Sequence, residues 1–408
     1  MARTTVRRRT VLAGTLALPA IWAGHRAEAQ AASDGVVKIG VLDDMTSVFS
    51  DQQGMGDYVA ARMAAEDFGP VLGVPVEVVQ ADLQNKADVG MAIARRWIDQ
   101  EKVDMILGLG NSAVALAVQD LCREKQRIDM VVAAGTTDLT GKACSPYGVH
   151  WTYDNYSAAK GPVQALVAED RKRWFFVTSD YAFGHSLEAN ASGILRVQGG
   201  EVAGAVRVPL GEADYSSHLV RAAASGAQVV GICAGGNDMI NIAKQMGEFG
   251  LLRRGVQPAA LNCSLTNIKS IGLETGQGLI YTEPYYWDQN EGTRAFAERF
   301  RRIHGRPPTA FQASCWGAVT HYLKAVRAAG TDAAGPVMAK MRELPINDFM
   351  TRDGHIRADG RVIRDMYMMR VKAPRDSRGE WDLLEVAQHI KGEDAFRPLD
   401  QGGCPLVR

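Results

Sequence analysis

The sequence lacks the features that mark nucleic-acid-binding, metal-binding and membrane-spanning proteins. It has 46 basic and 46 acidic side chains and no basic patch, which argues against nucleic acid or an anionic membrane surface as a partner. Its eight histidines show no helical metal-ligand spacing. Beyond the N-terminal segment, no apolar run reaches the ~20 residues that span a bilayer. We therefore expect no metal, no cofactor and no inserted membrane segment.

The six cysteines lack the C-x-x-C spacing of a zinc knuckle or a thioredoxin-type redox site. An even count in an exported protein permits disulfides, but the sequence alone leaves the pairing open. Any cysteine without a partner would serve as a small apolar side chain. The six are Cys122, Cys144, Cys233, Cys263, Cys315 and Cys404.

Residues 1–29 have the layout of a cleaved export signal. Three arginines at residues 7–9 precede a moderately apolar stretch, residues 11–23, and small residues at 27 and 29 suit a signal peptidase. The arginines followed by Thr10-Val11-Leu12 are twin-arginine-like, and the apolar stretch is too short for a membrane anchor. We predict cleavage after Ala29 and a periplasmic protein exported by the twin-arginine route.

The stretch from Val103 to Lys142 organises the rest of the chain. An apolar strand, Val103–Leu107, meets a turn with two glycines; a helix begins at Ser112 and a second strand, Met130–Ala134, leads to a Gly-Thr-Thr turn. This order predicts a parallel sheet crossed by helices, with both turns at the carboxyl ends of its strands. Ligands of open α/β sheets bind at that edge.

The turn residues indicate a small anion. Asn111, Ser112, Thr136 and Thr137 carry amide and hydroxyl donors, and the first turn of a helix leaves backbone N–H groups that favour negative charge. The alternative is that these side chains only cap helices. A small carboxylate fits the first interpretation.

A second stretch repeats the same order of elements. It has a strand from Val229, a Gly235–Gly236 turn, a helix from about Asp238, a strand Ala259–Asn262 and a polar turn Ser264–Asn267. The repeat predicts an α/β protein with two Rossmann-like lobes whose ligand-facing edges oppose each other.

The chain is long enough for two such domains. We assign residues 30–152 plus 285–344 to the first lobe and residues 153–284 plus 345–408 to the second. Polar, aromatic segments near 151–156 and 283–290 mark two of three crossings, which together predict a hinge rather than a free linker.

Aromatic residues at other predicted strand ends extend the candidate site. Phe49 stands in a polar loop, where an exposed ring could stack on a ligand or instead pack into the core, and Asp51 is a plausible helix cap. Tyr181 and Phe183 fall in a turn of the second lobe, from which their rings could close over an apolar ligand.

Several ordered segments resemble the leucine/isoleucine/valine-binding family of periplasmic solute-binding proteins, which serve ABC importers. They include KIGVLDDMTS, TTDLTGKACSPYGVHWTYD, WFFVTSDYAFGHSLE, AGGND, YYWDQNEGTRAF and AFRPLDQGGCPLV, and they cover essentially the whole mature chain. The resemblance is greatest to the branch associated with aromatic and small organic acids. It implies a type I periplasmic binding protein with a membrane permease as its partner.

The resemblance also implies a set of ligand residues and a disulfide. It implies that Cys144 pairs with Cys404, with Cys122–Cys144 as the competing pair. The implied ligand residues are Phe49, Ser50, Asp51, Asn111, Ser112, Ala134, Thr136, Thr137, Tyr181, Phe183, Asn237, Asp238, Ser264 and Thr266.

One departure from the family affects the ligand. Amino-acid binders place a carboxylate for the ligand ammonium near the turn that here reads CSLTN, which contains no acid. A buried unpaired ammonium is costly, so we expect an aromatic, 2-oxo or other organic acid. Asp238, Asp154 or Asp43 could substitute for the missing acid, and a branched-chain amino acid is therefore the main alternative ligand.

Two other functions are weaker alternatives. Gly108–Ala113 fits G-x-G-x-x-A, but the acid that a dinucleotide site needs at the end of the next strand is absent, so we do not expect an enzyme. A sensor that docks on a signalling receptor would have a similar pocket, and nothing in the chain separates it from a transport protein.

Overall fold

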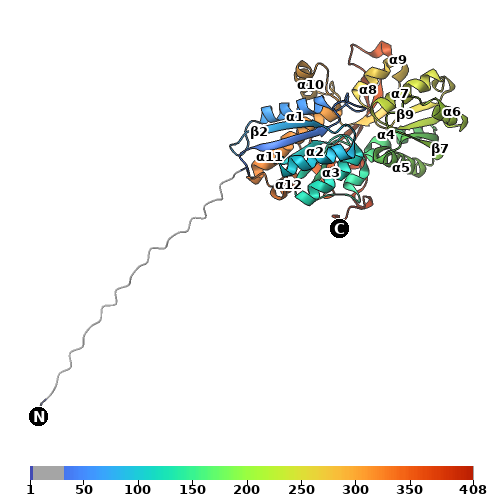
Figure 1. The fold of residues 1–408 in the computed structure, drawn as a ribbon. Helices are drawn as coiled ribbons and strands as arrows, with labels where there is room; N and C mark the ends of the chain where they lie inside the picture. Colours follow the sequence, from blue (N-terminus) through green and yellow to red (C-terminus); the bar gives the residue numbers. More distant parts are fainter. Residues whose placement is uncertain (3–31, 408) are drawn as a thin grey trace. The chain divides into compact units, whose positions relative to one another are not determined.

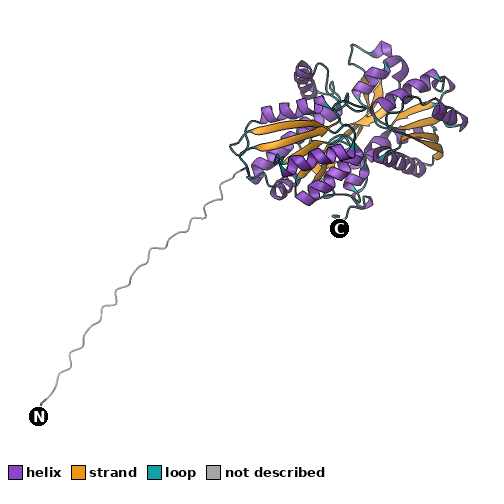
Figure 2. Ribbon diagram, in the orientation of Figure 1, coloured by secondary structure: helices purple, strands orange, loops and turns teal. Residues whose placement is uncertain are grey.

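The computed structural model describes residues 1–2 and 32–407, and the described residues from 32 onward belong to one compact unit. Figure 1 and Figure 2 show strands covered by helices in two regions of this unit. The predicted signal peptide lies outside the described residues. Within the described residues, every helix is too short or too polar to cross a membrane.

The first region is a parallel five-stranded sheet in the order β2-β1-β3-β4-β5. Its strands are β1 Val37–Asp43, β2 Val76–Asp82, β3 Met105–Gly108, β4 Ile128–Val131 and β5 Gly148–His150. The helices between them are α1 Met55–Phe68, α2 Ala87–Asp99 and α3 Ser112–Lys125, and the 3-10 turn η1 Thr137–Thr140 follows β4.

The second region is a parallel four-stranded sheet in the order β7-β6-β8-β9. Its strands are β6 Arg173–Ser179, β7 Glu201–Val208, β8 Val229–Cys233 and β9 Gln257–Ala260. Its helices are α4 Asn155–Ala168, α5 Ala182–Val197, α6 Ser216–Ala224, α7 Gly236–Glu248, α8 Leu265–Ile271 and α9 Leu273–Gly276.

The C-terminal third adds a small antiparallel sheet, β10-β13-β14, and a two-stranded hairpin. Their strands are β10 Ile280–Glu283, β11 His355–Ile356, β12 Val362–Ile363, β13 Met366–Val371 and β14 Leu384–Ile390. The helices are α10 Glu291–His304, α11 Ala310–Ala329, α12 Ala334–Glu343 and the short α13 Gly392–Ala395. As predicted, α11 returns to the first region, where it packs against α1.

Local sequence explains where the main helices begin. Asn111, before α3, accepts hydrogen bonds from the N–H groups of residues 113 and 114. Capping boxes begin α4 at Asp154, α8 at Ser264, α10 at Asn290 and α11 at Thr309. These side chains satisfy N–H groups that would otherwise lack intrahelical partners.

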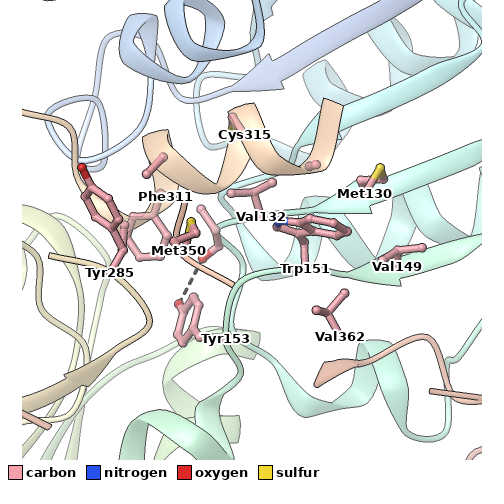
Figure 3. Close-up of a cluster of buried hydrophobic side chains, with 14 of the residues drawn as sticks. Met130, Val132, Val149, Trp151, Tyr153, Tyr285, Phe311, Cys315, Met350 and Val362 are labelled. Atoms are coloured by element: carbon pink, nitrogen blue, oxygen red, sulfur yellow. Dashed lines mark hydrogen bonds between the residues drawn. The ribbon is translucent and has the colours of Figure 1, made fainter. Parts of the chain in front are cut away.

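Buried apolar side chains connect the two parallel sheets through the first crossing. One cluster contains Val37 and Ile39 of the first sheet, Trp174 and Phe176 of the second, and residues of the crossing itself. Figure 3 shows Tyr153 of that crossing close to Phe311 of α11, with ring centroids 5.5 Å apart. The lobes are separate as sheets, but their cores meet at the crossing.

The C-terminal tail departs from our expectation that it returns to the second lobe. Cys404 forms a disulfide with Cys144, and Arg397 donates a hydrogen bond to the carbonyl oxygen of Thr137 (3.4 Å). The N–H of His150 in β5 donates to the carbonyl oxygen of Gly360 (2.9 Å). These parts of the tail are therefore fastened to the first lobe, and the disulfide implied by the family resemblance is confirmed.

Candidate functional site

The two turns singled out in the sequence meet at the carboxyl edge of the first sheet. Ser112 is fully buried at the start of α3, and its Oγ accepts a hydrogen bond from the N–H of Thr136 (3.3 Å). Asn111 uses its Oδ1 to cap α3. Ala134 is buried, and its carbonyl oxygen accepts from Nε2 of His150 (2.7 Å). The structure thus brings these four predicted residues into one place.

Thr137 links this edge to the second lobe. Its N–H donates to Oγ of Ser186 in α5 (3.2 Å), and its hydroxyl accepts from Nδ2 of Asn190 (3.2 Å). The Phe183 carbonyl, also in α5, accepts a hydrogen bond from Nδ2 of Asn155 (2.9 Å). The carboxyl edge of the first sheet therefore contacts the helix that follows β6 in the second.

Phe49 is buried rather than exposed, so the expectation of an exposed ring is wrong. Its side chain is 4% exposed, and it lies against the Gly235–Gly236 turn of the second lobe. Next to it, the Val48 carbonyl accepts a hydrogen bond from the N–H of Asn237 (3.3 Å). Gly236 has no side chain that would push this loop away. The loop therefore forms a second contact between the lobes.

Asp51 does not join the other candidates. It is exposed, and it pairs with Arg306 across 3.1 Å between Oδ1 and Nη1. It does not cap α1, whose N-cap is Gly54. Ser50 donates its hydroxyl hydrogen bond to the Ser47 carbonyl (2.8 Å). These two side chains are occupied within their own loop and its surroundings.

Tyr181 and Phe183 begin α5 instead of lying in a long turn. The helix begins at Ala182, directly after Tyr181, which takes an extended N-cap conformation. The two rings are stacked with centroids 5.9 Å apart. Phe183 faces Gly135 of the first lobe, where a Cβ would lie 2.9 Å from its Cε2. The aromatic pair therefore approaches the Gly-Thr-Thr turn.

The remaining second-lobe candidates are largely engaged with their own lobe. Ser264 and Thr266 belong to the start of α8, not to a polar turn: the Ser264 hydroxyl makes a capping bond to Oδ1 of Asn267 (3.0 Å). Asn237 is exposed in the first turn of α7. Asp238 is buried, and burial raises its pKa to about 6.

The three acids that could receive a ligand ammonium have other partners. Asp238 accepts from the N–H of Gly211 (3.1 Å), and Asp154 caps α4 through the N–H of Ser157 (2.8 Å). Asp43 accepts from the N–H of Gly110 (2.9 Å). Each of the three carboxylates therefore already accepts a hydrogen bond from the protein and is not wholly free to bind a ligand.

Sequence reasoning missed a polar group at the first crossing. The amide of Asn262, after β9, donates to Oη of Tyr153 (2.9 Å), and that hydroxyl donates to the carbonyl oxygen of Ala133 (3.0 Å). Oδ1 of the fully buried Asn155 has no hydrogen-bond partner among the described residues. The segment WTYDNY was visible as polar and aromatic, but which side chains turn inward depends on tertiary contacts.

Two further observations limit where the site lies and what it can hold. A groove of about 460 Å³ lies elsewhere, between α10 and residues 378–382, and is lined by none of the candidate residues. Across the described part of the chain, no group of three or more histidine, cysteine or acidic side chains is arranged to hold a metal ion. The candidate site offers neutral donors, aromatic rings and helix N-termini.

Two parallel sheets whose carboxyl-edge loops contact each other beside a crossing segment define a two-lobed solute-binding protein. The chain belongs to the periplasmic binding protein family, whose profile matches residues 36–379. The family resemblance and the predicted fold class, two α/β lobes with parallel sheets, are confirmed.

Solved structures and curated relatives agree with this assignment. A periplasmic binding protein from Burkholderia mallei is 41% identical, with 92% of this chain and 100% of that chain covered and a TM-score of 0.90. A branched chain amino acid ABC transporter periplasmic ligand-binding protein from Burkholderia xenovorans LB400 is 40% identical (91% and 100% covered, TM-score 0.82). The Leu/Ile/Val-binding protein homolog 6 of Brucella melitensis is 27% identical over 285 residues, which are 68% of this chain and 72% of the relative.

More distant structures share the fold. A solute binding protein of an ABC transporter from Rhodopseudomonas palustris, solved with 3,4-dihydroxy benzoic acid, is 20% identical, with 88% of this chain and 98% of that chain covered and a TM-score of 0.79. The family and these relatives are solute-binding proteins rather than enzymes. The chain is thus a periplasmic substrate-binding protein of the ABC-transporter type.

Proposed function

We propose that this protein traps a small carboxylate, an aromatic or 2-oxo organic acid, between its two lobes and delivers it to the permease of an ABC importer. The observation that carries the proposal is the meeting of Ser112 with Thr136 at the start of α3. Their hydroxyls and neighbouring N–H groups are neutral donors at a helix N-terminus, a setting that favours an anion. No arginine or lysine is among the proposed ligand residues.

The state of the nearby acids favours a ligand without an amino group. Asp43, Asp154 and Asp238 each accept hydrogen bonds from protein N–H groups. A ligand ammonium would have to compete with those bonds or remain unpaired, and a buried unpaired charge is strongly unfavourable. An organic acid avoids this cost.

The aromatic residues favour a ligand with a flat apolar part. Phe49, Tyr181 and Phe183 lie at or near the contact between the lobes. Aromatic rings stack or meet edge to face with other rings. The R. palustris protein that binds 3,4-dihydroxy benzoic acid has the same fold at 20% identity, which is consistent with this ligand class but shows only the fold.

Neutral donors are sufficient for useful affinity. Hydrogen bonds to a charged group contribute roughly 1.5–3 kcal/mol each, and burying about 120 Å² of apolar ligand surface adds roughly 3 kcal/mol. Three or four such bonds and that burial suffice for about micromolar binding after the entropic cost of association. We propose that hinge closure completes these contacts and that the precursor is exported by the twin-arginine route.

A thermal-shift screen tests the ligand class. The purified protein is heated with aromatic acids, 2-oxo acids and branched-chain amino acids at equal concentrations. We expect a higher unfolding midpoint with one or more of the organic acids, because a ligand that binds only the folded state stabilises it.

Branched-chain amino acids are the second candidate, since two relatives carry names of that class. A shift with the amino acids alone would replace the proposed ligand class with this one. An absence of any shift with either group, in protein first unfolded and refolded to remove bound ligand, would contradict both.

A further inference from the structure

Two carboxyl groups lie fully buried behind the loop that joins β3 to α3. Asp43 ends β1 and Asp57 lies in the first turn of α1, and both side chains are inaccessible to solvent. The loop in front of them, residues 108–111, leads directly to Ser112. Since an uncompensated buried charge is very unfavourable, the partners of this pair determine its charge.

Asp43 holds the loop by direct contact. Its Oδ1 accepts a hydrogen bond from the N–H of Gly110 (2.9 Å), and a Cβ on Gly108 would collide with its Oδ2. Leu109, between the two glycines, has φ +60°, a left-handed conformation that an apolar side chain rarely adopts. A strained loop of this kind persists only where its surroundings enforce it.

Asp57 has an unusual set of neighbours. Within the described residues, no N–H or hydroxyl group donates to either of its carboxyl oxygens. It faces the carboxyl of Asp43 and the thiol of Cys315 in α11, while Asp43 also faces Asp44. None of these neighbours is a cationic side chain.

Asp44 is already satisfied and does not join the pair. Its carboxylate accepts from Nδ2 of Asn85 (2.7 Å) and from the N–H of Phe49 (2.8 Å). Oδ2 of Asp43 and both carboxyl oxygens of Asp57 receive no hydrogen bond from an N–H or hydroxyl group among the described residues. Two carboxyl groups that face each other without such donors can hydrogen-bond only if one of them carries a proton. Burial raises the pKa of Asp43 to about 7 and that of Asp57 well above its ordinary value.

We propose that Asp43 and Asp57 are positioning residues: they share a proton between β1 and α1, and this pair holds residues 108–111 in the shape that binds ligand. This proposal rests on the proposed function in one respect: Asn111 and Ser112 are ligand residues only if that function is correct. The carboxyl pair would then support the ligand-binding loop in a way that depends on its protonation.

Hydrogen–deuterium exchange tests the support without any ligand. Replacing Asp43 with Ala removes the acceptor for Gly110, and we expect exchange of the amides in residues 108–112 to rise about tenfold or more relative to wild type. Asp43→Asn and Asp57→Asn each mimic a protonated carboxyl, so both variants should fold and keep the loop protected. The matched control is Asp88→Asn, an exposed carboxyl in the first turn of α2.

The pH profile of binding tests the shared proton. The probe is whichever of 4-hydroxybenzoate, 4-methyl-2-oxopentanoate and leucine gives the largest thermal shift, with Kd measured by calorimetry at pH 6 and pH 8. Loss of a proton places a second negative charge behind the loop that holds the ligand carboxylate, so wild-type affinity should fall severalfold as pH rises. Asp43→Asn should bind the probe at pH 6 like wild type and lose most of that dependence.

The outcomes separate this proposal from the proposed function. Loop exchange in Asp43→Ala equal to that of the Asp88→Asn control would overturn it, and so would an unchanged pH profile in Asp43→Asn. If Asp43→Ala does not fold, the two Asn variants decide instead. The proposal is overturned if Asp43→Asn and Asp57→Asn do not fold, or if the amides of residues 108–112 exchange faster in them than in wild type. If Ser112→Ala and Thr136→Val bind the probe like wild type, the proposed ligand site is wrong, but the exchange result still decides whether the pair supports the loop.

Discussion

The hydroxyl groups of Ser112 and Thr136 use only part of their hydrogen-bonding capacity within the folded chain. Among the described residues, the Ser112 hydroxyl accepts one hydrogen bond, from the N–H of Thr136, and the Thr136 hydroxyl accepts one from the N–H of Asp138 (3.4 Å). Each hydroxyl keeps its own proton available for donation. A buried hydroxyl with a free proton at a helix N-terminus is well suited to an anion.

Removing either hydroxyl should weaken binding more than folding. We expect Ser112→Ala and Thr136→Val each to weaken binding of a carboxylate ligand by about 1–3 kcal/mol, since each loses one hydrogen bond to a charged group. Titration calorimetry with the acid found in the screen measures this change, and the thermal midpoint without ligand measures the fold.

Ser217→Ala in α6 is the matched control. Ser217 is exposed, so the substitution removes a hydroxyl that is far from the site in the sequence and makes no buried contact. Unchanged affinity in both Ser112→Ala and Thr136→Val would remove these residues from the ligand site. An equal loss of affinity in Ser217→Ala would mean that the effect is not local.

At the scale of single elements, short-range pattern predicted the parallel strands and most helices. The apolar runs before Gly108 and Gly235 predicted the positions of β3 and β8 to within two residues. A flanking glycine and a continuous apolar run are both local signals, which is why this prediction was possible. The start of α8 was mistaken for a turn, since its capping residues Ser264 and Asn267 are also common in turns.

Long-range pairing was not predictable in the same way. The antiparallel sheet pairs β10 with β13, which begins more than 80 residues later in the chain, and no local pattern encodes that partnership. Phe49 was expected to be exposed because its neighbours in sequence are polar, but the turn that buries it lies in the other lobe. The candidate site could be placed at strand ends, whereas its inward-facing side chains depend on how the lobes meet.

The turn between β8 and α7 offers a test of contact between the lobes. Gly236 has φ +56°, and a Cβ there would collide with the Val48 carbonyl and lie 2.8 Å from Cδ1 of Phe49. We expect Gly236→Ala to weaken ligand binding by about tenfold or more, because a collision of this size opposes approach of the lobes by on the order of 1–3 kcal/mol.

The control separates the collision from backbone strain. Gly199 also has a left-handed φ, +78°, but a Cβ there would meet no atom within 4 Å. Gly199→Ala should therefore lower the thermal midpoint to a similar extent as Gly236→Ala while leaving the ligand Kd unchanged. Equal affinity of the two variants, measured by calorimetry, would show that the contact at Gly236 does not contribute to binding.

At the scale of the whole molecule, a disulfide attaches the C-terminal tail to the first lobe. The Cys144–Cys404 disulfide joins residues 260 positions apart, and the other four cysteines are buried and unpaired. A covalent bond across so long a separation restricts the unfolded chain more than the folded one. The disulfide therefore keeps the C-terminal tail attached to the first lobe.

Buried acids should make the stability of the whole molecule depend on pH. Burial raises the pKa of Glu283 in β10 to about 8, against an ordinary value of 4.5, and raises that of Asp104 to about 7. The folded state then binds more protons than the unfolded state between the two values, so stability falls as pH rises through this range. His321, whose pKa burial lowers to about 4, has the opposite effect, which fades as the pH rises above its ordinary value of 6.5. Toward pH 8 the raised pKa values of the acids therefore determine the sign.

Glu283→Gln isolates one of these contributions. Glutamine can still accept the hydrogen bond from Oη of Tyr281 (3.1 Å) but does not titrate. We expect the free energy of unfolding, measured by urea denaturation, to fall less steeply in the variant, by about 1–2 kcal/mol between pH 6.5 and pH 8. Glu385→Gln removes an exposed carboxyl from β14 of the same sheet and should leave the wild-type dependence intact. Parallel pH profiles for Glu283→Gln and wild type would mean that Glu283 is already ionised in the folded protein, which would require a compensating partner that the structure does not provide among its described residues.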